Sequence, residues 1–155
     1  RLRPDRIIVG ECRSGEALDM IQAMNSGHAG SMTTVHANSP KDALARIETL
    51  ALLSKVELPL VALRAQVAGA IQVLVQADRL ADGSRKVTYV SEVLPLDNEG
   101  RYQVQHLLAF EPSGRDPKGK VLGAHKLTGK RPTFWDEVKA KGLDARLKLL
   151  KNAFA

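Results

Sequence analysis

The chain has 155 residues, of which 44% are hydrophobic and 26% are charged, an ordinary composition for one globular domain that excludes disorder throughout. The formal charge of +6 is uneven, because residues 101–155 hold 12 basic and 5 acidic side chains whereas residues 1–100 hold 11 and 12. A single cysteine excludes an internal disulfide, and no apolar run approaches the roughly 20 residues of a membrane-spanning helix, so we expect a soluble, cytoplasmic protein.

The first part of the chain alternates predicted strands and helices. The apolar, β-branched run Ile7–Val9 is typical of a strand buried on both faces of a parallel sheet, and Glu11 follows at its carboxyl end. Helical spacing of apolar residues covers 14–25, and a second strand is predicted over 31–36. Ser39 is a suitable N-cap for a helix that begins at Pro40 and ends near Leu53. This alternation predicts an α/β fold.

Predicted hairpins follow this α/β region. Pro59 opens a third helix, and a strand is predicted at 71–75. Asp82-Gly83 is a hairpin turn motif, and strands are predicted at 87–93 and 102–110. These segments predict antiparallel hairpins appended to the α/β part.

The last third of the chain differs in composition. Gly, Pro and Lys become frequent after Glu111, which predicts an exposed basic loop, and apolar spacing predicts a helix over 134–150. We therefore divide the chain into a core, residues 1–110, and a basic loop and helical extension, residues 111–155. The starting residue, Arg1, is not Met, so we expect the chain to be a fragment.

The segment IIVGE has the form of a Walker B element, in which an acid at the end of a buried strand faces a phosphate and magnesium site. Adjacent strands of a doubly wound sheet bring their carboxyl ends to one crevice, so Glu11 and His36 are expected to share a site. Structural roles are the alternative for Glu11 and for the histidines, and Arg13 could instead pair with Glu16. Two histidines eight residues apart without thiolate partners make a poor zinc site, and no metal ligands are assigned.

The residues also carry a family resemblance. The segment RIIVGECRSGEALDMIQAMNSGHAGSMTTVHANSPKDALARIETL resembles the Walker B and His-box region of the ATPases that power type II and type IV secretion and pilus assembly. The later segments LADGSRKVTYVSEV and TGKRPTF are most similar to the tight-adherence (Flp) pilus branch. The resemblance implies the C-terminal part of a RecA-like P-loop NTPase core that hydrolyses ATP with Mg²⁺.

The resemblance also implies roles for individual residues. Glu11 matches the Walker B acid that orients and deprotonates the attacking water. His28 and His36 match the His box that senses the γ-phosphate, and Thr33 and Thr34 match hydroxyls that donate hydrogen bonds to phosphate or to this water. Arg13 matches the arginine that follows this acid, which acts as an interface or sensor residue. His106 and His125 match no motif. The implied partners are a homo-hexamer and inner-membrane platform proteins, with the protein peripheral at the inner membrane.

The chain departs from this family in one respect. It contains no phosphate-binding loop of the form G-x-x-x-x-G-K-[ST]; the segment Gly123–Arg131 has five residues between its glycines and no Ser or Thr after Lys130. We therefore predict that the chain alone neither hydrolyses ATP nor binds it tightly.

The basic C-terminal part leaves an alternative of another class, a non-enzymatic module that binds nucleic acid or an anionic membrane surface. No nucleic-acid motif is present, so no specific nucleic acid is expected.

Overall fold

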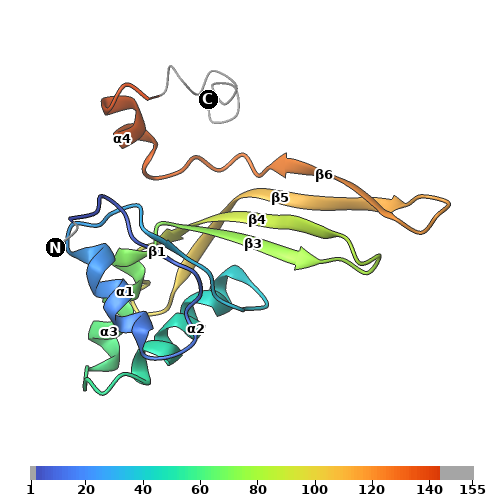
Figure 1. Ribbon diagram of the computed structural model, residues 1–155. Coiled ribbons are helices and arrows are strands. Elements are labelled where there is room, and N and C mark those ends of the chain that lie inside the picture. The colour runs from blue at the N-terminus through green and yellow to red at the C-terminus, as the bar shows by residue number, and fades with distance from the viewer. Residues whose placement is uncertain (1–2, 144–155) are drawn as a thin grey trace. The chain divides into compact units, whose positions relative to one another are not determined.

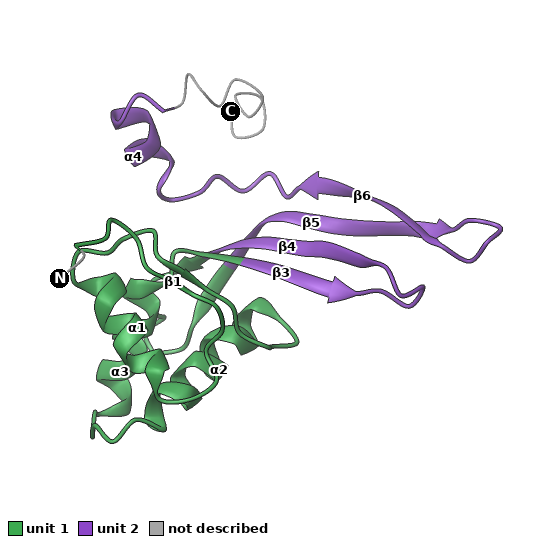
Figure 2. Cartoon of the chain, in the orientation of Figure 1, with its two compact units in different colours: residues 1–74, 93–104 green, residues 75–92, 105–155 purple. Residues whose placement is uncertain are grey.

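The structure, a computed structural model, describes residues 3–143. Its elements follow in the order β1, α1, β2, α2, α3, β3, β4, β5, β6 and α4 (Figure 1). Contacts divide the chain into two units, coloured separately in Figure 2: unit 1 contains residues 1–74 and 93–104, and unit 2 contains residues 75–92 and 105–155. These units differ from the core and extension that the sequence predicts, which meet at residue 110. The boundary at residue 110 stays a prediction.

Unit 1 begins with two short parallel strands. β1 (Ile8–Val9) pairs with β2 (Met32–Thr33) in the register Ile8 to Met32 and Val9 to Thr33, so the predicted strands form but are shorter than expected. The expected burial of β1 on both faces is wrong, because Ile8 is 71% exposed. Successive side chains of a strand face opposite sides, and only the Val9 side packs against the hydrophobic core.

Three helices supply the core of unit 1. α1 (Glu16–Asn25), α2 (Pro40–Leu52) and α3 (Leu60–Ala70) form where apolar spacing predicts them, and Ser39 Oγ accepts a hydrogen bond from Asp42 N at 3.1 Å, as an N-cap should. Gly15, the N-cap residue of α1, lets the helix start lie close to the end of α2, because an added Cβ would meet backbone atoms of Ser54 at 3.0 Å. The best-buried side chains of the three helices are Leu18, Ile21, Leu44, Ile47, Leu63 and Val67.

A four-stranded sheet, ordered β3-β4-β5-β6, contains the predicted hairpins. Its strands are β3 (Val73–Arg79), β4 (Arg85–Leu94), β5 (Gln103–Arg115) and β6 (Val121–Leu127). The predicted turn at Asp82-Gly83 joins β3 to β4, with Leu80 N donating to Ser84 O at 2.8 Å.

The predicted exposed loop after Glu111 is wrong where β5 continues to Arg115 and β6 pairs with it in antiparallel register. Residues 128–132, predicted as part of the same loop, lie in no helix or strand, as expected. The turn between them is fixed by Asp116, whose Oδ1 accepts hydrogen bonds from Lys118 N and Lys120 N at 2.9 and 2.8 Å. β6 is an edge strand with mostly exposed side chains, so it lacks the apolar alternation by which strands are identified in a sequence.

The C-terminal helix is shorter than predicted. α4 spans Trp135–Ala140, and the chain leaves the helix at Gly142, which has a φ of 66°. The predicted helical residues 144–150 lie outside the described residues. Within unit 2, Glu92 fixes the segment before α4, because this carboxylate, 2% exposed, accepts hydrogen bonds from Thr133 N, Thr133 Oγ1 and Gln105 Nε2. No helix of residues 3–143 combines the length and the hydropathy needed to cross a bilayer.

Candidate functional site

The carboxyl ends of β1 and β2 in unit 1 place the candidate site. The strand ladder ends at the pair Val9 and Thr33, and two further hydrogen bonds join the segments beyond it. Thr34 Oγ1 donates to Gly10 O at 2.6 Å, and Cys12 N donates to Thr34 O at 2.9 Å. The residue between Gly10 and Cys12 is Glu11, so its backbone is held on both sides by Thr34.

The Glu11 carboxylate contacts the side chains of two basic residues. Its Oε1 lies 3.0 Å from His36 Nε2, and its Oε2 lies 2.6 Å from Arg13 Nη2 and 2.7 Å from Arg13 Nε. The side chains of His36 and Arg13 are 90% and 77% exposed, whereas that of Glu11 is 23% exposed. The structure thus brings Glu11 and His36 together, as parallel strands with adjacent carboxyl ends predict, and adds Arg13 to them.

The alternative pairing of the Arg13 side chain with Glu16 is absent, because Glu16 binds backbone instead. Glu16 Oε1 accepts hydrogen bonds from Arg13 N at 2.6 Å and from Ser14 N at 3.0 Å. A carboxylate at the start of α1 satisfies N–H groups that the helix leaves free and complements the helix dipole. These hydrogen bonds lower the pKa of Glu16.

The site electrostatics keep Glu11 ionised at neutral pH. The hydrogen bond from the Arg13 side chain is the largest effect and lowers the pKa of Glu11, desolvation opposes it, and Coulombic interactions with Arg13 and then His36 lower the pKa further. The same contact raises the pKa of Arg13. The three side chains therefore form a local charge cluster with an anion at its centre.

Two predicted site residues lie elsewhere. His28 precedes β2, next to Ser31, whose Oγ donates to His28 O at 2.7 Å, so it lies at the amino end of the strand pair whereas Glu11 and His36 lie at the carboxyl end. Its Nδ1 is buried and has no hydrogen-bond partner among residues 3–143. Thr33 Oγ1 contacts Cys12 Sγ at 3.5 Å and Thr34 O at 3.4 Å. Neither His28 nor Thr33 contacts Glu11 within the described residues.

The two histidines that match no motif, His106 and His125, lie in the sheet of unit 2. His106 Nδ1 lies 2.8 Å from Ser91 Oγ, and the ring stacks on Tyr89 with centroids 4.4 Å apart. His125 Nε2 lies 2.9 Å from Val87 O. These contacts are sufficient to explain both histidines as structural residues.

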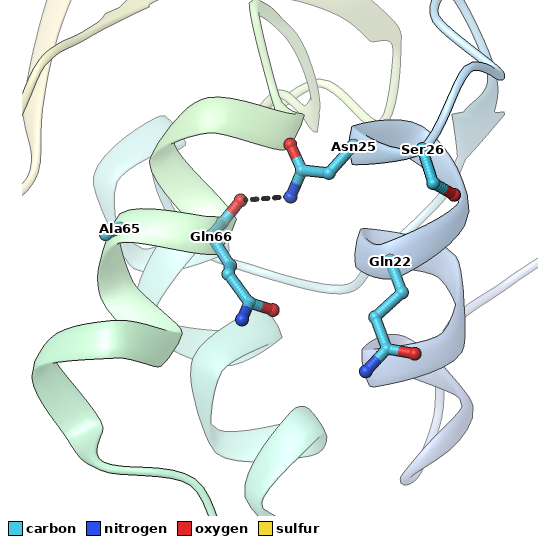
Figure 3. Close-up of a pocket in the computed structure, with 5 residues that line it drawn as sticks. All are labelled: Gln22, Asn25, Ser26, Ala65 and Gln66. Carbon is cyan, nitrogen blue, oxygen red and sulfur yellow. Dashed lines mark hydrogen bonds between the residues drawn. The ribbon is translucent and has the colours of Figure 1, made fainter.

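An open groove of about 660 Å³ lies between α1 and α3 in unit 1 and contains no predicted site residue. Figure 3 shows its amide and hydroxyl side chains, with Asn25 Nδ2 donating to Gln66 O at 3.0 Å. The lining carries no charge, so the groove lacks the cations that a nucleotide phosphate requires. Its lining residues are Gln22, Asn25, Ser26, Ala65 and Gln66.

Glu16 and Cys12 lie beside the site and bond to backbone near it, and the sequence did not indicate these backbone contacts. An acidic residue after Ser14-Gly15 at the start of a predicted helix is a recognisable capping pattern. No local pattern indicates that the Cys12 backbone bonds to Thr34, because the two residues are 22 positions apart in the sequence.

Solved structures place the fold in a known class. The crystal structure of the VirB11 ATPase from the Brucella suis type IV secretion system, in complex with sulphate, is 32% identical and superposes with a TM-score of 0.56, over 59% of this chain and 29% of that chain. This likeness confirms the predicted fold class, the C-terminal part of a RecA-like P-loop NTPase core.

Curated relatives agree with this class. A protein of Mycobacterium tuberculosis (strain H37Rv) named for conjugal transfer is 42% identical over 103 residues, 66% of this chain and 28% of that protein. The conjugal transfer protein TrbB of Rhizobium radiobacter is 37% identical over 113 residues, 72% and 32% of the two chains. The type IV secretion system protein VirB11 of Bartonella quintana is 41% identical over 95 residues, 58% and 26%. The chain spans about a quarter to a third of the length of these relatives.

The family assignment rests on a longer match. Residues 1–132, which include every candidate site residue and both sheets, match a family described as type II/IV secretion system protein. The relatives named above support this superfamily, and the tight-adherence branch is not among their names. The chain therefore belongs to the type II/IV secretion system protein family.

Proposed function

We propose that the intact protein is a hexameric ATPase of the tight-adherence pilus branch, which hydrolyses ATP in the cytoplasm at the inner membrane to drive pilus assembly or secretion. The observation that carries this proposal is the contact of Glu11, at the end of β1, with His36 and Arg13. The family membership gives the contact its meaning, since a carboxylate beside two exposed cations suits the hydrolysis of an anionic substrate.

Glu11 is the proposed general base. Its Oε2 accepts a hydrogen bond from Arg13 Nε, and its Oε1 lies 3.0 Å from His36 Nε2. A carboxylate has about four lone-pair positions, so we propose that the attacking water binds at Oε1, next to His36. A base must be unprotonated to accept a proton, and the lowered pKa of Glu11 ensures this at neutral pH.

The exposed cations Arg13 and His36 are the proposed contacts of the γ-phosphate. Both can move to a bound phosphate, because their side chains are mostly in solvent. His28 and Thr33 are proposed to complete the His box, with the buried Nδ1 of His28 free for a partner.

Mg²⁺ is proposed to enter the site with ATP, because a magnesium ion at such sites keeps several waters and binds through one or two carboxylates and the substrate phosphates. Residues 3–143 contain no group of three His, Cys, Asp or Glu side chains that could hold a metal without the nucleotide. The Glu11 carboxylate is paired with Arg13 and lies 3.0 Å from His36 Nε2, so we assign no Mg²⁺ ligand among the described residues.

The chain alone is proposed to be inactive. The nearest match to a phosphate-binding loop, Gly123–Arg131, lies in the edge strand β6 and the segment that follows it, whereas such a loop must lead into a helix N-terminus.

A Glu11→Gln variant of the intact protein tests the proposed function. Loss of a general base typically lowers kcat by 10²- to 10⁴-fold, and we expect KM for ATP to change little, because Glu11 contributes to proton transfer rather than to binding. The matched control is Glu16→Gln, which removes a carboxylate from the same segment but not from the cluster. Equal turnover by Glu11→Gln and wild type would exclude Glu11 from the mechanism. Calorimetric titration of the 155-residue chain with Mg-ATP is expected to show no micromolar binding.

A second candidate function, binding to nucleic acid or to an anionic membrane surface, is favoured by one observation in unit 2. The β3-β4 and β5-β6 turns lie side by side, because Asp82 Oδ2 accepts a hydrogen bond from Val121 N at 2.7 Å. Six basic side chains near these turns form no ion pair within residues 3–143. They are Arg79, Arg85, Lys86, Arg115, Lys118 and Lys120.

Gel shifts with duplex DNA and sedimentation with anionic vesicles test this second function. Binding that weakens steeply with salt, and that is reduced by changing Lys118 and Lys120 to Gln, would support it. Failure to bind either surface at low salt would overturn it.

A further inference from the structure

Thr34 makes two hydrogen bonds to the segment that carries Glu11. Its hydroxyl donates to Gly10 O at 2.6 Å, and its carbonyl accepts from Cys12 N at 2.9 Å. The regular pairing of β1 and β2 ends one residue earlier, at Val9 and Thr33. Thr34 is therefore the residue that continues the pairing past the catalytic position.

We propose that Thr34 is a positioning residue, which fixes the backbone on both sides of Glu11 so that the carboxylate lies within reach of His36. This inference rests on the proposed function, because the position of the Glu11 carboxylate affects the reaction only if Glu11 is the general base. It differs from the role expected from the sequence, in which the hydroxyl donates to phosphate.

The hydroxyl cannot perform both roles at once. A threonine hydroxyl has one proton, and in this structure the proton is directed to the Gly10 carbonyl. Phosphate oxygens of bound ATP only accept hydrogen bonds, so contact with Thr34 would require the bond to Gly10 to break. The 2.6 Å distance is that of a well-formed O–H···O bond.

Gly10 makes such a bond necessary. A glycine has more backbone freedom than any other residue, and nothing lies within 4 Å of the position where its Cβ would be. Without the Thr34 hydroxyl, the Gly10 carbonyl loses its hydrogen bond to Thr34, and of the two hydrogen bonds of Thr34 only that from Cys12 N remains. A displacement of about 1 Å at a reacting group can cost about 10²-fold in rate.

The first test uses the 155-residue chain and does not depend on catalysis. NMR titration of the Glu11 side-chain carboxyl in wild type is expected to give a pKa below the ordinary value, because Arg13 and His36 hold the ionised form. Thr34→Val keeps the shape but removes the hydroxyl, and we expect the pKa of Glu11 to rise toward the ordinary value of a glutamate side chain. Thr34→Ser retains the hydroxyl and is expected to behave as wild type. Circular dichroism of each variant verifies that the chain is folded.

The second test uses the intact protein. Thr34→Val is expected to lower kcat about 10- to 100-fold with KM for ATP unchanged, and Thr34→Ser is expected to restore most of the rate. If Thr34→Val raises KM and leaves the Glu11 titration unchanged, the hydroxyl contacts phosphate and the positioning role is wrong. Full activity of Glu11→Gln would overturn the proposed function instead, and the Glu11 titration of Thr34→Val would still report whether Thr34 positions the carboxylate.

Discussion

Tyr102 joins three segments of unit 1 through a single carboxylate, and removal of its hydroxyl should measurably destabilise the chain. The Tyr102 hydroxyl donates to Glu48 Oε2 at 2.9 Å, and Arg64 Nε donates to the same oxygen at 2.9 Å. Tyr102 precedes β5, whereas Glu48 and Arg64 lie on α2 and α3. Both Tyr102 and the Glu48 carboxylate are well buried.

The expected cost of Tyr102→Phe follows from this geometry. A hydrogen bond to a charged group contributes about 1.5–3 kcal/mol, and the lower part of this range applies because Glu48 keeps its Arg64 partner while the aromatic ring stays packed. We expect the free energy of unfolding to fall by about 1.5–2 kcal/mol. For a chain of this size each kcal/mol lowers Tm by about 2–4 °C, so Tm should fall by about 3–8 °C.

Urea denaturation of wild type and Tyr102→Phe at pH 7 measures this cost. The matched control is Tyr89→Phe, because the Tyr89 hydroxyl makes no hydrogen bond within residues 3–143 while its ring stacks on His106. The control should change the free energy of unfolding by less than about 0.5 kcal/mol. Equal values for the two variants would refute the reasoning that the hydroxyl of Tyr102 links the segments.

The pH dependence supplies an independent check. Burial raises the pKa of Tyr102, and the adjacent Glu48 carboxylate raises it further. In the unfolded chain a tyrosine loses its proton near pH 10, so above this pH the unfolded state binds fewer protons and wild type loses stability. Tyr102→Phe lacks this loss, and the stabilities of the two proteins should converge as the pH rises from 9 to 11. A constant difference over this range would show that Tyr102 ionises normally.

Two further predictions concern the charge cluster and the segment before α4. Arg13→Gln removes the main cause of the lowered pKa of Glu11 in the free enzyme, so in the intact protein the acid limb of the kcat/KM profile should move to higher pH, with activity lost as Glu11 becomes protonated. An unmoved limb would contradict the assignment of Glu11 as the base. Thr133→Val removes one hydrogen-bond donor from the buried Glu92 carboxylate and should lower the free energy of unfolding, measured by urea denaturation, by about 1–3 kcal/mol. Thr133→Ser keeps the hydroxyl and should unfold with nearly the wild-type free energy. Equal losses in both variants would show that the hydroxyl is not the important group.

The parts of the fold that could be predicted are those with local causes. Ser39 and Pro40 begin α2 by capping and by a fixed φ, both of which are properties of neighbouring residues. The contact of Glu11 with His36 follows from a rule of topology, since consecutive parallel strands present their carboxyl ends at one edge.

The parts that could not be predicted depend on distant residues. β6 forms because its backbone pairs with β5, from Leu108 opposite Leu127 to Arg115 opposite Val121, and its exposed side chains do not reveal this pairing. Likewise, the side chain of Arg13 has two acidic neighbours in the sequence. The Arg13 side chain pairs with Glu11 because the Glu16 carboxylate already accepts hydrogen bonds from the backbone N–H groups of Arg13 and Ser14, just before α1.

The cluster combines a fixed carboxylate with displaceable cations, a combination that the proposed reaction needs. The backbone of Glu11 is held by the two hydrogen bonds of Thr34, which join uncharged groups and are therefore screened little by salt. Its contacts with Arg13 and His36 are exposed ion pairs, which water and salt weaken. In the proposed reaction, a phosphate anion attracts Arg13 while the carboxylate keeps its position. The loss of Arg13 from the carboxylate would raise the pKa of Glu11 and make it a stronger base at the time when the substrate is bound.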